Sequence, residues 1–462
     1  MSFSSDVVIG LEIHVELNTK SKLFCSCSTA SSAIPNCFVC PVCLGHPGSK
    51  PTPNKEAVRK VLLLSKALGC VLDEELVFAR KSYFYPDMSK NFQVTQFDRP
   101  LGREGVLELR NGAKISISRV HLEEDPASLT HPSGLGSSEY SLIDYNRSGR
   151  PLAEVVTGPD ITSASMAREF LEELLLVLSY TEVFDGDAVL KADANVSIRE
   201  SGFCRVEIKN ITGFKEVERA LEFEISRQKK LVSSGKQVSL DTRLWNGSET
   251  VFMRSKESEE DYGYVFDADL AVVSVSGLEV EEVELPVSVY RRFVKLGLSS
   301  SDASVMASDK FLAGLFERLV ASGADVVLVA RWLRRELLRV LNYASVSVRD
   351  SPISFDQLTS VIGLLGSEKI TENTAKKLME RLMSEDFVVE EIVKKEGLLV
   401  VRDENAIDSL VQEVVKEFPD AVKDVVSGEE KALNFLLGQV MRKSRGAADA
   451  EVAKKTLLRQ IK

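Results

Sequence analysis

The sequence is poor in several residue types, and each shortage narrows what the chain can be. It has only 7 cysteines, 4 histidines and 2 tryptophans among 462 residues. So low a cysteine content excludes a disulfide scaffold. No segment is apolar for the roughly 20 residues that a membrane helix needs, and the start MSFSSDVVIG has no basic region followed by an apolar run. We therefore expect a soluble, cytoplasmic protein with no membrane partner.

An excess of basic residues is also missing. With 58 Lys and Arg against 69 Asp and Glu, the net charge is −11, which argues against nucleic-acid binding over the whole surface. The balance is reversed locally, because residues 431–462 include 8 basic residues and only 2 acids. A nucleic-acid contact in this segment is therefore compatible with the acidic total.

Two common catalytic devices are missing as well. The sequence contains no G-x-x-x-x-G-K-[ST] or G-x-G-x-x-G stretch, so a bound nucleotide would be held by a metal ion and basic side chains. All 4 histidines lie before residue 132 and no G-x-S-x-G elbow occurs, so a Ser or Cys nucleophile with a histidine base is not indicated. A chain of this kind would need ammonia or another nucleophile from elsewhere.

What is present is a globular composition, 44% hydrophobic and 27% charged, with enough apolar material for two or three cores. Up to about residue 285, short β-rich runs alternate with turns, and Asn111-Gly112 predicts a hairpin. Apolar spacings of three and four predict helices over residues 55–68, 163–180 and 215–231.

The character of the sequence changes at two later points. After Leu285-Pro286 long helical patterns replace the strand patterns, which predicts a domain boundary. Near Glu396-Gly397 a short loop precedes three further helical segments. A small C-terminal helical domain is therefore expected.

Five of the cysteines are crowded together in turn-prone sequence. Cys25, Cys27, Cys40 and Cys43 form a C-x-C…C-x-x-C array whose thiolates can converge on one tetrahedral ion, and zinc is the expected one. Four thiolates leave no open coordination position, so we expect a structural site. Cys37 could replace one of the four, and scattered unpaired cysteines are the alternative.

Acidic residues and histidines gather in two further segments. The alternation of the first predicted strand, VVIGLEIHVEL, puts Glu12, His14 and Glu16 on one face, which fits a hard-metal site or an ordinary solvated strand face. The segment HLEED, residues 121–125, follows an apolar run and fits a metal site or a solvated turn. Together with Glu154, these residues would complete a multi-carboxylate site for magnesium and the phosphates of a nucleotide.

Acidic and basic groups also alternate along the segments KADANVSIRE and RVEIKN. Their density in sequence of good β-propensity suits the handling of phosphates and carboxylates, although strand surfaces carry such residues routinely. The residues concerned are Lys191, Asp193, Asn195, Arg199, Arg205, Glu207 and Lys209.

Taken together, the segments described resemble the B subunit of the aspartyl/glutamyl-tRNA amidotransferase over nearly the whole chain. The blocks stand in the family's order: GLEIHVELNTKSKLFCSC, CPVCLGHPG, RKSYFYPDMSKNFQVTQFDRPLG, HLEED, DYNRSGRPLAEVV, DANVSIR, EIKNI, TRLW and MRSKE. Further along, LGLSSSDASVM, ELLRVLN and EKALNFLLGQVMRKSRGAAD resemble its helical and tail domains.

The resemblance implies an α+β fold in three domains. The first, residues 1–290, would be a mainly antiparallel, glutamine-synthetase-like catalytic cradle with a zinc-binding insertion near residues 25–43. Residues 291–396 would form a helical domain, and residues 397–462 a tail domain that contacts tRNA.

The resemblance also implies a reaction, that of a ligase of protein biosynthesis. With ATP and Mg²⁺ the subunit would phosphorylate the side-chain carboxylate of Glu or Asp misacylated onto tRNA(Gln) or tRNA(Asn), and ammonia would then displace phosphate. Ammonia would come from a glutaminase A subunit, with a small C subunit completing a heterotrimer. The amide formed would be that of Gln, of Asn or of both.

Site residues follow from the same resemblance. It implies Glu12, His14 and Glu124 as metal ligands, with Glu123 and Glu154 as further candidates. The chemistry of their side chains adds Lys191, Arg205 and Lys209 as groups that neutralise phosphate charge. The basic residues Arg442, Lys443 and Arg445 are expected to contact tRNA.

The chain departs from the family in three places: Pro126-Ala127-Ser128 follows HLEED instead of Ala-Gly-Lys, Gly263 replaces an Arg, and Arg150 replaces an apolar residue. The first two departures give weight to an alternative, a non-catalytic zinc-stabilised scaffold that binds tRNA. A second alternative, the archaeal E-type relative, carries an extra domain for which this chain has no room.

Overall fold

The structure, a computed structural model, describes residues 5–134, 138–185, 190–255, 262–400, 404–444 and 448–461. The chain divides into two compact units, Met1–Ser288 and Val289–Lys462. Strands are confined to the first unit among the described residues. The α+β class expected from the sequence is confirmed, whereas the division into three domains stays a prediction.

The first unit is built on a sheet of nine strands in the order β14-β13-β12-β11-β1-β10-β7-β6-β2. Every neighbouring pair is antiparallel except β12 with β13. The strands are β1 (Val7–Glu16), β2 (Val71–Leu72), β6 (Gly102–Glu108), β7 (Lys114–Glu124), β10 (Pro151–Thr157), β11 (Lys191–Ile198), β12 (Val206–Thr212), β13 (Asp241–Trp245) and β14 (Thr250–Ser255).

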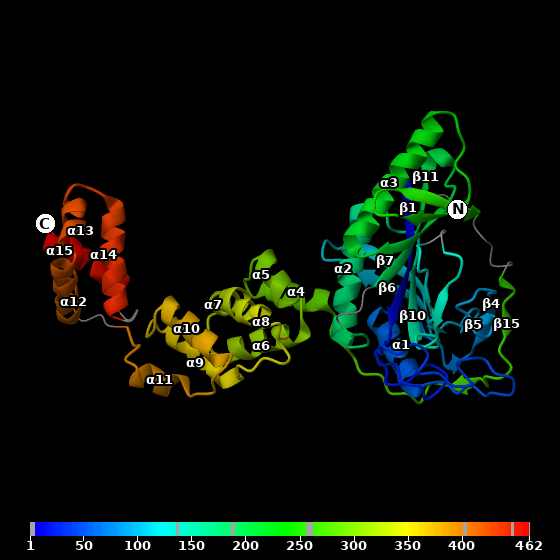
Figure 1. Cartoon of the computed structure of the whole chain (residues 1–462), viewed down its shortest axis with the longest axis horizontal. Helices are drawn as coiled ribbons and strands as arrows, with labels where there is room; N and C mark the ends of the chain where they lie inside the picture. Colours follow the sequence, from blue (N-terminus) through cyan, green and yellow to red (C-terminus); the bar gives the residue numbers. More distant parts are fainter. Residues whose placement is uncertain are drawn as a thin grey trace. The chain divides into compact units, whose positions relative to one another are not determined.

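Three helices cover one face of this sheet, as Figure 1 shows. They are α1 (Lys55–Ala67), α2 (Ala164–Thr181) and α3 (Phe214–Ser233), which confirms the three helices predicted from apolar spacing. Leu11, Ile13 and Val15 of β1 are buried in the core that the helices share with the sheet. Because side chains alternate along a strand, Glu12, His14 and Glu16 lie on the opposite face.

The predicted hairpin is also present. Strands β6 and β7 pair antiparallel on either side of Asn111-Gly112. The Gly112 φ of +87° is a conformation that glycine adopts without steric cost. This hairpin places the C-terminal end of β7, the HLEED segment, next to β10.

Smaller sheets complete the first unit. Strand β4 (Ala79–Ser82) lies between β5 (Phe92–Thr95) and β15 (Val265–Phe266). Two further pairs join β3 (Glu75–Leu76) to β16 (Val273–Ser274) and β8 (Ser128–Thr130) to β9 (Leu142–Asp144).

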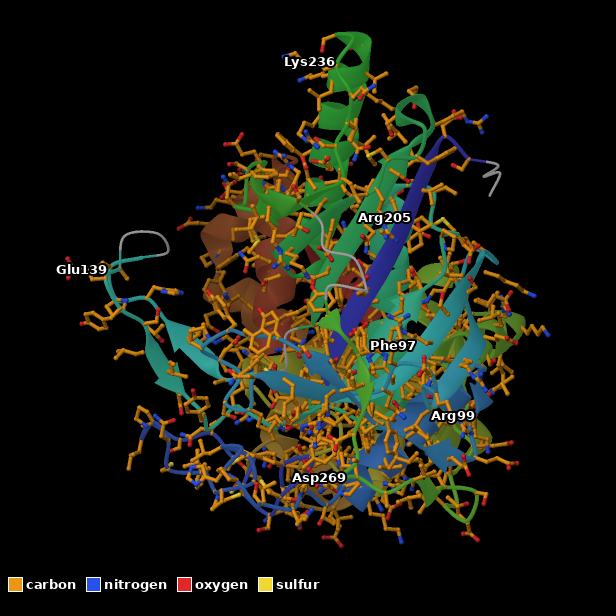
Figure 2. The ribbon with its side chains drawn as sticks, turned by 90° about the vertical axis from the view of Figure 1, so that its right-hand side faces the viewer. Phe97, Arg99, Glu139, Arg205, Lys236 and Asp269 are labelled. Atoms are coloured by element: carbon orange, nitrogen blue, oxygen red, sulfur yellow. The ribbon has the colours of Figure 1, made fainter. Side chains whose placement is uncertain are left out.

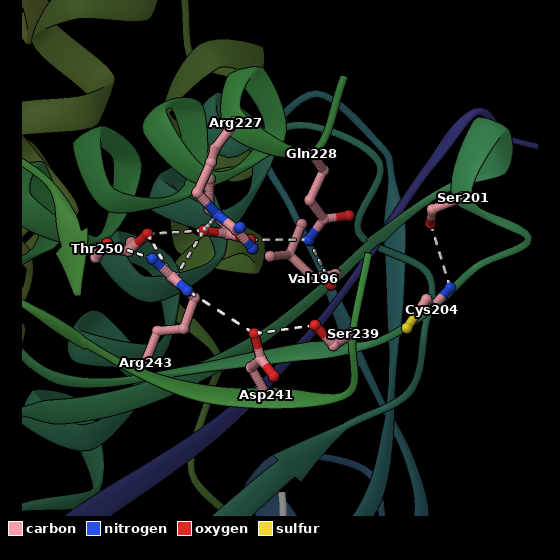
Figure 3. Close-up of polar contacts among 10 residues, drawn as sticks. Val196, Ser201, Cys204, Arg227, Gln228, Ser239, Asp241, Arg243 and Thr250 are labelled. Atoms are coloured by element: carbon pink, nitrogen blue, oxygen red, sulfur yellow. Dashed lines mark hydrogen bonds and ion pairs between the residues drawn. The ribbon is translucent and has the colours of Figure 1, made fainter. Parts of the chain in front are cut away.

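A buried ionic network fixes α3 to the sheet (Figure 3). Glu224 is fully buried; it accepts two hydrogen bonds from Arg227, at 2.8 and 2.6 Å, and one from the Thr250 hydroxyl at 2.7 Å. Gln228 donates to Glu224 and to the carbonyl of Val196 on β11. Arg243 of β13 donates to Thr250 and lies 3.7 Å from the Glu224 carboxylate. We call Glu224 and these four side chains (Arg227, Gln228, Arg243 and Thr250) the Glu224 network.

Helices joined by loops, without strands, make up the described residues of the second unit, and the first of these helices begins just before the unit boundary. Its α-helices are α4 (Pro286–Lys295), α5 (Ser300–Met306), α6 (Lys310–Ala321), α7 (Val326–Trp332), α8 (Leu338–Tyr343), α9 (Phe355–Gly366), α10 (Glu372–Leu382), α11 (Val389–Lys395), α12 (Glu404–Glu417), α13 (Pro419–Val426), α14 (Glu430–Lys443) and α15 (Ala450–Ile461). The last four share a hydrophobic cluster of their own. Within the described part of the chain, no helix has the length and apolar character that crossing a membrane requires.

Candidate functional site

The sheet brings two histidines and two glutamates together on the face opposite the helices. In the register of the sheet, His14 of β1 stands opposite Glu154 of β10, and Glu154 stands opposite His121 of β7. Glu123 follows His121 by two residues and therefore projects from the same face of β7. We call His14, His121, Glu123 and Glu154 the acid–imidazole cluster.

The side chains of this cluster are in direct reach of one another. His14 Nε2 lies 3.5 Å from Glu123 Oε1 and 3.4 Å from Glu154 Oε2. His121 Nε2 lies 3.7 Å from Glu123 and 3.5 Å from Glu154. Only His14 is appreciably exposed, at 29% of its side chain, while the other three lie between 5% and 12%. The cluster thus has one accessible side.

The carboxylates of the cluster change the acidity of its members. Burial opposes a charge on His14, but the hydrogen bond to Glu154 and the charges of Glu123 and Glu154 outweigh burial and raise the pKa of His14 to about 9. Burial likewise opposes ionisation of Glu154, yet His121 and His14 bring its pKa below the usual range. The cluster therefore favours a cation at its centre.

A divalent metal ion fits this arrangement. His14, Glu123 and Glu154 can each offer one ligand atom, and the three atoms lie within 4.8 Å of one another. Carboxylate oxygens are the ligands preferred by Mg²⁺, and one imidazole is compatible with Mn²⁺ as well. The Nδ1 atom of His121 is buried without a hydrogen-bond partner among the described residues.

Glu12, also expected at the metal, belongs to a neighbouring group. It accepts a hydrogen bond from Asn195 of β11 at 3.1 Å. Next to it, Lys209 of β12 lies 2.6 Å from Asp193 and 3.5 Å from Glu207. Burial would lower the pKa of Lys209, but these two carboxylates and Glu12 raise it above the usual range. The Lys209 ammonium is thus already neutralised by carboxylates of the protein.

The other two predicted cations lie differently. Lys191 stands opposite His14 in the sheet and forms no ion pair among the described residues. Burial, and then the charge of Arg147, lower the pKa of Lys191. Arg205 is exposed and directly precedes β12, and in Figure 2 it is labelled beside the upper part of the sheet. The structure therefore brings Lys191 to the acid–imidazole cluster, but not Arg205.

Glu124 is the predicted metal ligand that the structure separates from the others. Because it is the neighbour of Glu123 on β7, it projects from the opposite face. There its carboxylate pairs with the Lys90 ammonium and accepts a hydrogen bond from the backbone N–H of Val94 at 2.8 Å. These contacts hold β5 against β7, and they direct Glu124 away from His14.

Sequence reasoning missed a second set of charged residues beside the cluster. Arg147 donates to the buried Asp125, with 2.7 Å between Nη2 and Oδ1. Burial raises the pKa of Asp125 to about 6 although the charge of Arg147 opposes the rise. Arg150, noted only as a departure from the family, pairs with Glu16 at the end of β1. Both arginines lie in the segment 145–150, which we call the arginine loop.

His121 was also missed as an individual residue, although the segment HLEED had been singled out. The signal was in the sequence, because His121 and Glu123 are two residues apart in a strand and share a face. The same rule that grouped Glu12 with His14 would have grouped this pair and separated Glu124.

The four predicted zinc ligands do come together. The Sγ atoms of Cys25, Cys27, Cys40 and Cys43 all lie within 4.8 Å of one another, a spacing that suits tetrahedral coordination by thiolates. Cys37 is exposed and contacts Ser32 and Asn146 instead. We call the group of four the cysteine cluster.

The thiols of the cysteine cluster differ in acidity: the hydrogen bond with Cys43 raises the pKa of Cys25 above its usual range, and burial raises the pKa of Cys27 to about 11, whereas the pKa of Cys43 is lowered. A hydrogen bond from Cys25, the backbone N–H of Cys40 and the charge of Lys22 outweigh burial and lower the pKa of the Cys43 thiol to about 5. A thiolate is the form that binds a metal ion.

Two of the family departures can be placed. Ser128 lies in β8. Gly263, at a φ of +49°, lies between Tyr262 and Tyr264, and the Tyr264 ring stacks on Phe97 with 3.9 Å between ring centroids.

The basic residues near the C-terminus are only partly described. Arg442 and Lys443 end α14 and are exposed. Lys443 lies 3.0 Å from both Glu413 and Glu417 of α12. Arg445 lies outside the described residues.

Comparison with known proteins identifies relatives of the whole chain. Residues 7–281 match the family model described as the GatB/GatE catalytic domain, and residues 314–461 match the one described as the GatB domain. A protein of Carboxydothermus hydrogenoformans is 40% identical over 470 residues, which covers 98% of each chain, and one of Methanocaldococcus jannaschii is 41% identical over 460 residues, 95% of this chain and 94% of its own. Each of the two is named as the B subunit of an aspartyl/glutamyl-tRNA(Asn/Gln) amidotransferase.

Proposed function

The chain belongs to the family of aspartyl/glutamyl-tRNA(Asn/Gln) amidotransferase B subunits, which are ligase-type enzymes, and from this premise we propose that it activates the side-chain carboxylate of an amino acid esterified to tRNA. The substrates are Glu on tRNA(Gln), Asp on tRNA(Asn), or both. The observation that carries the proposal is the acid–imidazole cluster, a metal-binding arrangement within a family that forms amides.

The chemistry of the substrate explains why activation is needed. A carboxylate is a poor electrophile, since its leaving group would be oxide. Transfer of the terminal phosphoryl group of ATP to a carboxylate oxygen gives an acyl phosphate and ADP. Ammonia then forms the new C–N bond, and the C–O bond to phosphate breaks. Phosphoryl transfer depends mainly on positioning and on neutralisation of charge.

Three residues of the cluster are proposed to hold the metal. His14, Glu123 and Glu154 would bind Mg²⁺, which supplies charge neutralisation at the phosphates of ATP. His121 pairs with both glutamates and orients them. Glu12 lies two residues from His14 on the same strand face, and we propose that it acts from the neighbouring group rather than as one of the three ligands.

The predicted cations take unequal parts in this proposal. Lys191 faces His14 and has no carboxylate partner among the described residues, so its charge is available to a phosphate. Lys209 is instead held by Asp193 and Glu207, and we propose that it orders these carboxylates and Glu12 rather than binding phosphate directly. Arg205, exposed before β12, and Glu124, paired with Lys90, are proposed at most for peripheral contacts.

Ammonia is proposed to come from a glutaminase A subunit, with a C subunit in the same heterotrimer. The sequence has no histidine after residue 131, so a nucleophile with a histidine base of its own is not indicated. The cysteine cluster is proposed to hold a structural Zn²⁺ ion, because its four thiols leave no open position for a substrate. The exposed end of α14 is proposed to contact tRNA.

The experiment that tests this function is amidation of misacylated tRNA by the reconstituted heterotrimer. Wild-type chain is compared with His14→Ala, with ATP, Mg²⁺ and glutamine supplied. We expect the variant to lose amide formation while glutamine hydrolysis by the partner continues. Amidation at the wild-type rate by His14→Ala would show that the acid–imidazole cluster has no catalytic part, as the non-catalytic scaffold alternative requires.

A second measurement tests the proposed composition of the assembly. Mass spectrometry of the intact native complex should find this chain with two partner chains and one zinc ion. An assembly without either partner or without zinc would remove that part of the proposal.

A further inference from the structure

A lysine is completely buried beneath the cysteine cluster. Lys22 is 1% exposed and is among the largest fully buried side chains of the chain. Its ammonium nitrogen lies 3.7 Å from Cys43 Sγ and donates a hydrogen bond to the carbonyl of Tyr145 at 3.0 Å. In the described part of the chain no carboxylate is within ion-pair distance of it.

Such a group needs a negative charge close by. A buried ammonium without compensation costs several kcal/mol, and lysine is rarely buried completely unless it is paired. The group in contact with Lys22 that can supply the charge is the cysteine cluster, because four thiolates around a Zn²⁺ ion leave a net negative charge. The Tyr145 carbonyl that the Lys22 ammonium also contacts is neutral, so a charged cysteine cluster supplies the compensating charge.

The same lysine reaches the arginine loop. Besides the Lys22 bond to Tyr145, the backbone N–H of Leu23 donates to the carbonyl of Gly149 at 2.8 Å, and Gly149 N–H donates to the carbonyl of Asp125 at 2.8 Å. Gly149 has a φ of +82°, and a side chain there would meet Lys22 and Cys43 at 3.7 Å. The loop is therefore packed between the cysteine cluster and the end of β7.

The arginine loop places two positive charges beside the acid–imidazole cluster. Its Arg147 and Arg150 pair with Asp125 and Glu16, which border the acid–imidazole cluster. A loop fixed at Tyr145 and Gly149 holds both arginines in place, because only a few residues separate the fixed points from them.

We propose that Lys22 is a positioning residue: its ammonium is the counter-charge of the metal-bound cysteine cluster and, through the carbonyl of Tyr145, it ties that cluster to the arginine loop. The cysteine cluster then does more than stabilise residues 25–43. It also orders Arg147 and Arg150 beside the acid–imidazole cluster. The inference rests on the zinc assignment of the proposed function, and not on the amidation reaction.

The test compares Lys22→Met with Lys20→Met in the full chain. Both variants lose one positive charge in the same segment, but Lys20 is exposed. Zinc content is first determined, and the rate of zinc release to a coloured chelator is then followed. Loss of an outer partner of a metal ligand typically costs 10–100-fold in metal affinity, so we expect zinc release from Lys22→Met to be about 10–100-fold faster. Release at the rate of Lys20→Met would overturn the proposal.

Hydrogen exchange of residues 145–150 supplies the readout for the loop. We expect faster exchange there in Lys22→Met, and also in wild-type chain from which a chelator has removed zinc. The wild-type measurement does not depend on the folding of a variant. If zinc removal speeds exchange over residues 25–43 but leaves 145–150 unchanged, the link to the arginine loop is wrong. Neither readout uses amidation, so a failure here is distinct from a failure of the proposed function.

Discussion

The first unit contains two groups of charged residues that look alike in composition and differ in how their charges are balanced. In the Glu224 network a buried carboxylate is met by two arginines, an amide and a hydroxyl, all from the protein. In the acid–imidazole cluster the charged partners of the two carboxylates are imidazoles, with the Thr95 hydroxyl donating to Glu123 at 3.3 Å and no lysine or arginine in ion-pair contact among the described residues. The first group is complete by itself, whereas the second favours an added cation.

This difference distinguishes charged groups that stabilise the fold from charged groups that bind a ligand. A buried ionic network whose carboxylate is met by arginines of the protein fixes one element to another, as Glu224 fixes α3. A cluster that is short of positive charge has residual affinity for ligands, and perturbed pKa values at such places are typical of functional sites. Mutations in the two groups should therefore affect different properties.

The largest effect is expected from Glu224→Ala. It leaves Arg227 without its carboxylate and Arg243 with Asp241 alone, and breaking a buried pair costs about 3–5 kcal/mol of unfolding free energy. Denaturant unfolding of the full chain measures this loss, with Glu222→Ala, an exposed acid of the same helix, as the control. Equal stability of the two variants would contradict the structural part assigned to the network.

Glu154→Gln should reduce activity more than stability, the opposite of Glu224→Ala. It keeps the size of the side chain but removes one anionic metal ligand, so we expect amidation by the heterotrimer to fall on the order of 100- to 1,000-fold, the scale of losing one group that stabilises reaction charge. Its denaturation midpoint should fall less than that of Glu224→Ala, because Glu123 still pairs with both histidines. The exposed Glu139→Gln, labelled far from the sheet in Figure 2, is the matched control. If Glu154→Gln mainly unfolds the chain, the distinction between the two groups is lost.

The pH dependence of metal binding should show the charge shortage directly. Neutral imidazole is the ligand, and the pKa of His14 is raised to about 9, so its proton must leave when a metal ion binds. The apparent affinity for Mn²⁺ should therefore rise by about tenfold per pH unit between pH 7 and 9. For the metal-free chain, the free energy of unfolding should change with pH in the opposite direction. Protonated His14 stabilises the folded chain at pH values below the ordinary histidine pKa, and this stabilisation is lost as pH rises through about 9. Calorimetric titration at several pH values measures the affinity, and a flat profile would contradict the account.

The smallest effect, on tRNA affinity, is expected at the end of α14. Here too a charged side chain that is paired within the protein stands next to one that is not. Lys443 is already paired with Glu413 and Glu417, while Arg442 has no ion pair among the described residues. Replacing Arg442 by Ala should reduce the slope of log affinity for tRNA against log salt by about one, and Lys443→Ala should reduce it by less. Equal slopes for both variants and wild type would remove this helix end from the tRNA contact.

Local periodicity was enough to predict a good part of the fold. The spacing of apolar residues gave α1, α2 and α3 within two residues at each end, and Asn111-Gly112 gave the β6–β7 hairpin. The alternation along β1 correctly separated His14 from the buried Ile13 and Val15. These features depend on neighbours in the sequence, which is why the sequence alone contains them.

The site was predicted less completely, for two physical reasons. Glu124 was grouped with Glu123 because the segment HLEED was treated as one block, although neighbours in a strand face opposite ways. The pairing of Arg147 with Asp125 and of Arg150 with Glu16 depends on a loop that packs on β7 and β1 from far along the chain. Such long-range register leaves no pattern in a single sequence.

The most direct test of the central claim is anomalous diffraction at the manganese edge from crystals of the chain grown with Mn²⁺. We expect a manganese ion bonded to His14 Nε2 and to one carboxylate oxygen each of Glu123 and Glu154. Manganese bound elsewhere, with these three side chains left to one another, would contradict it.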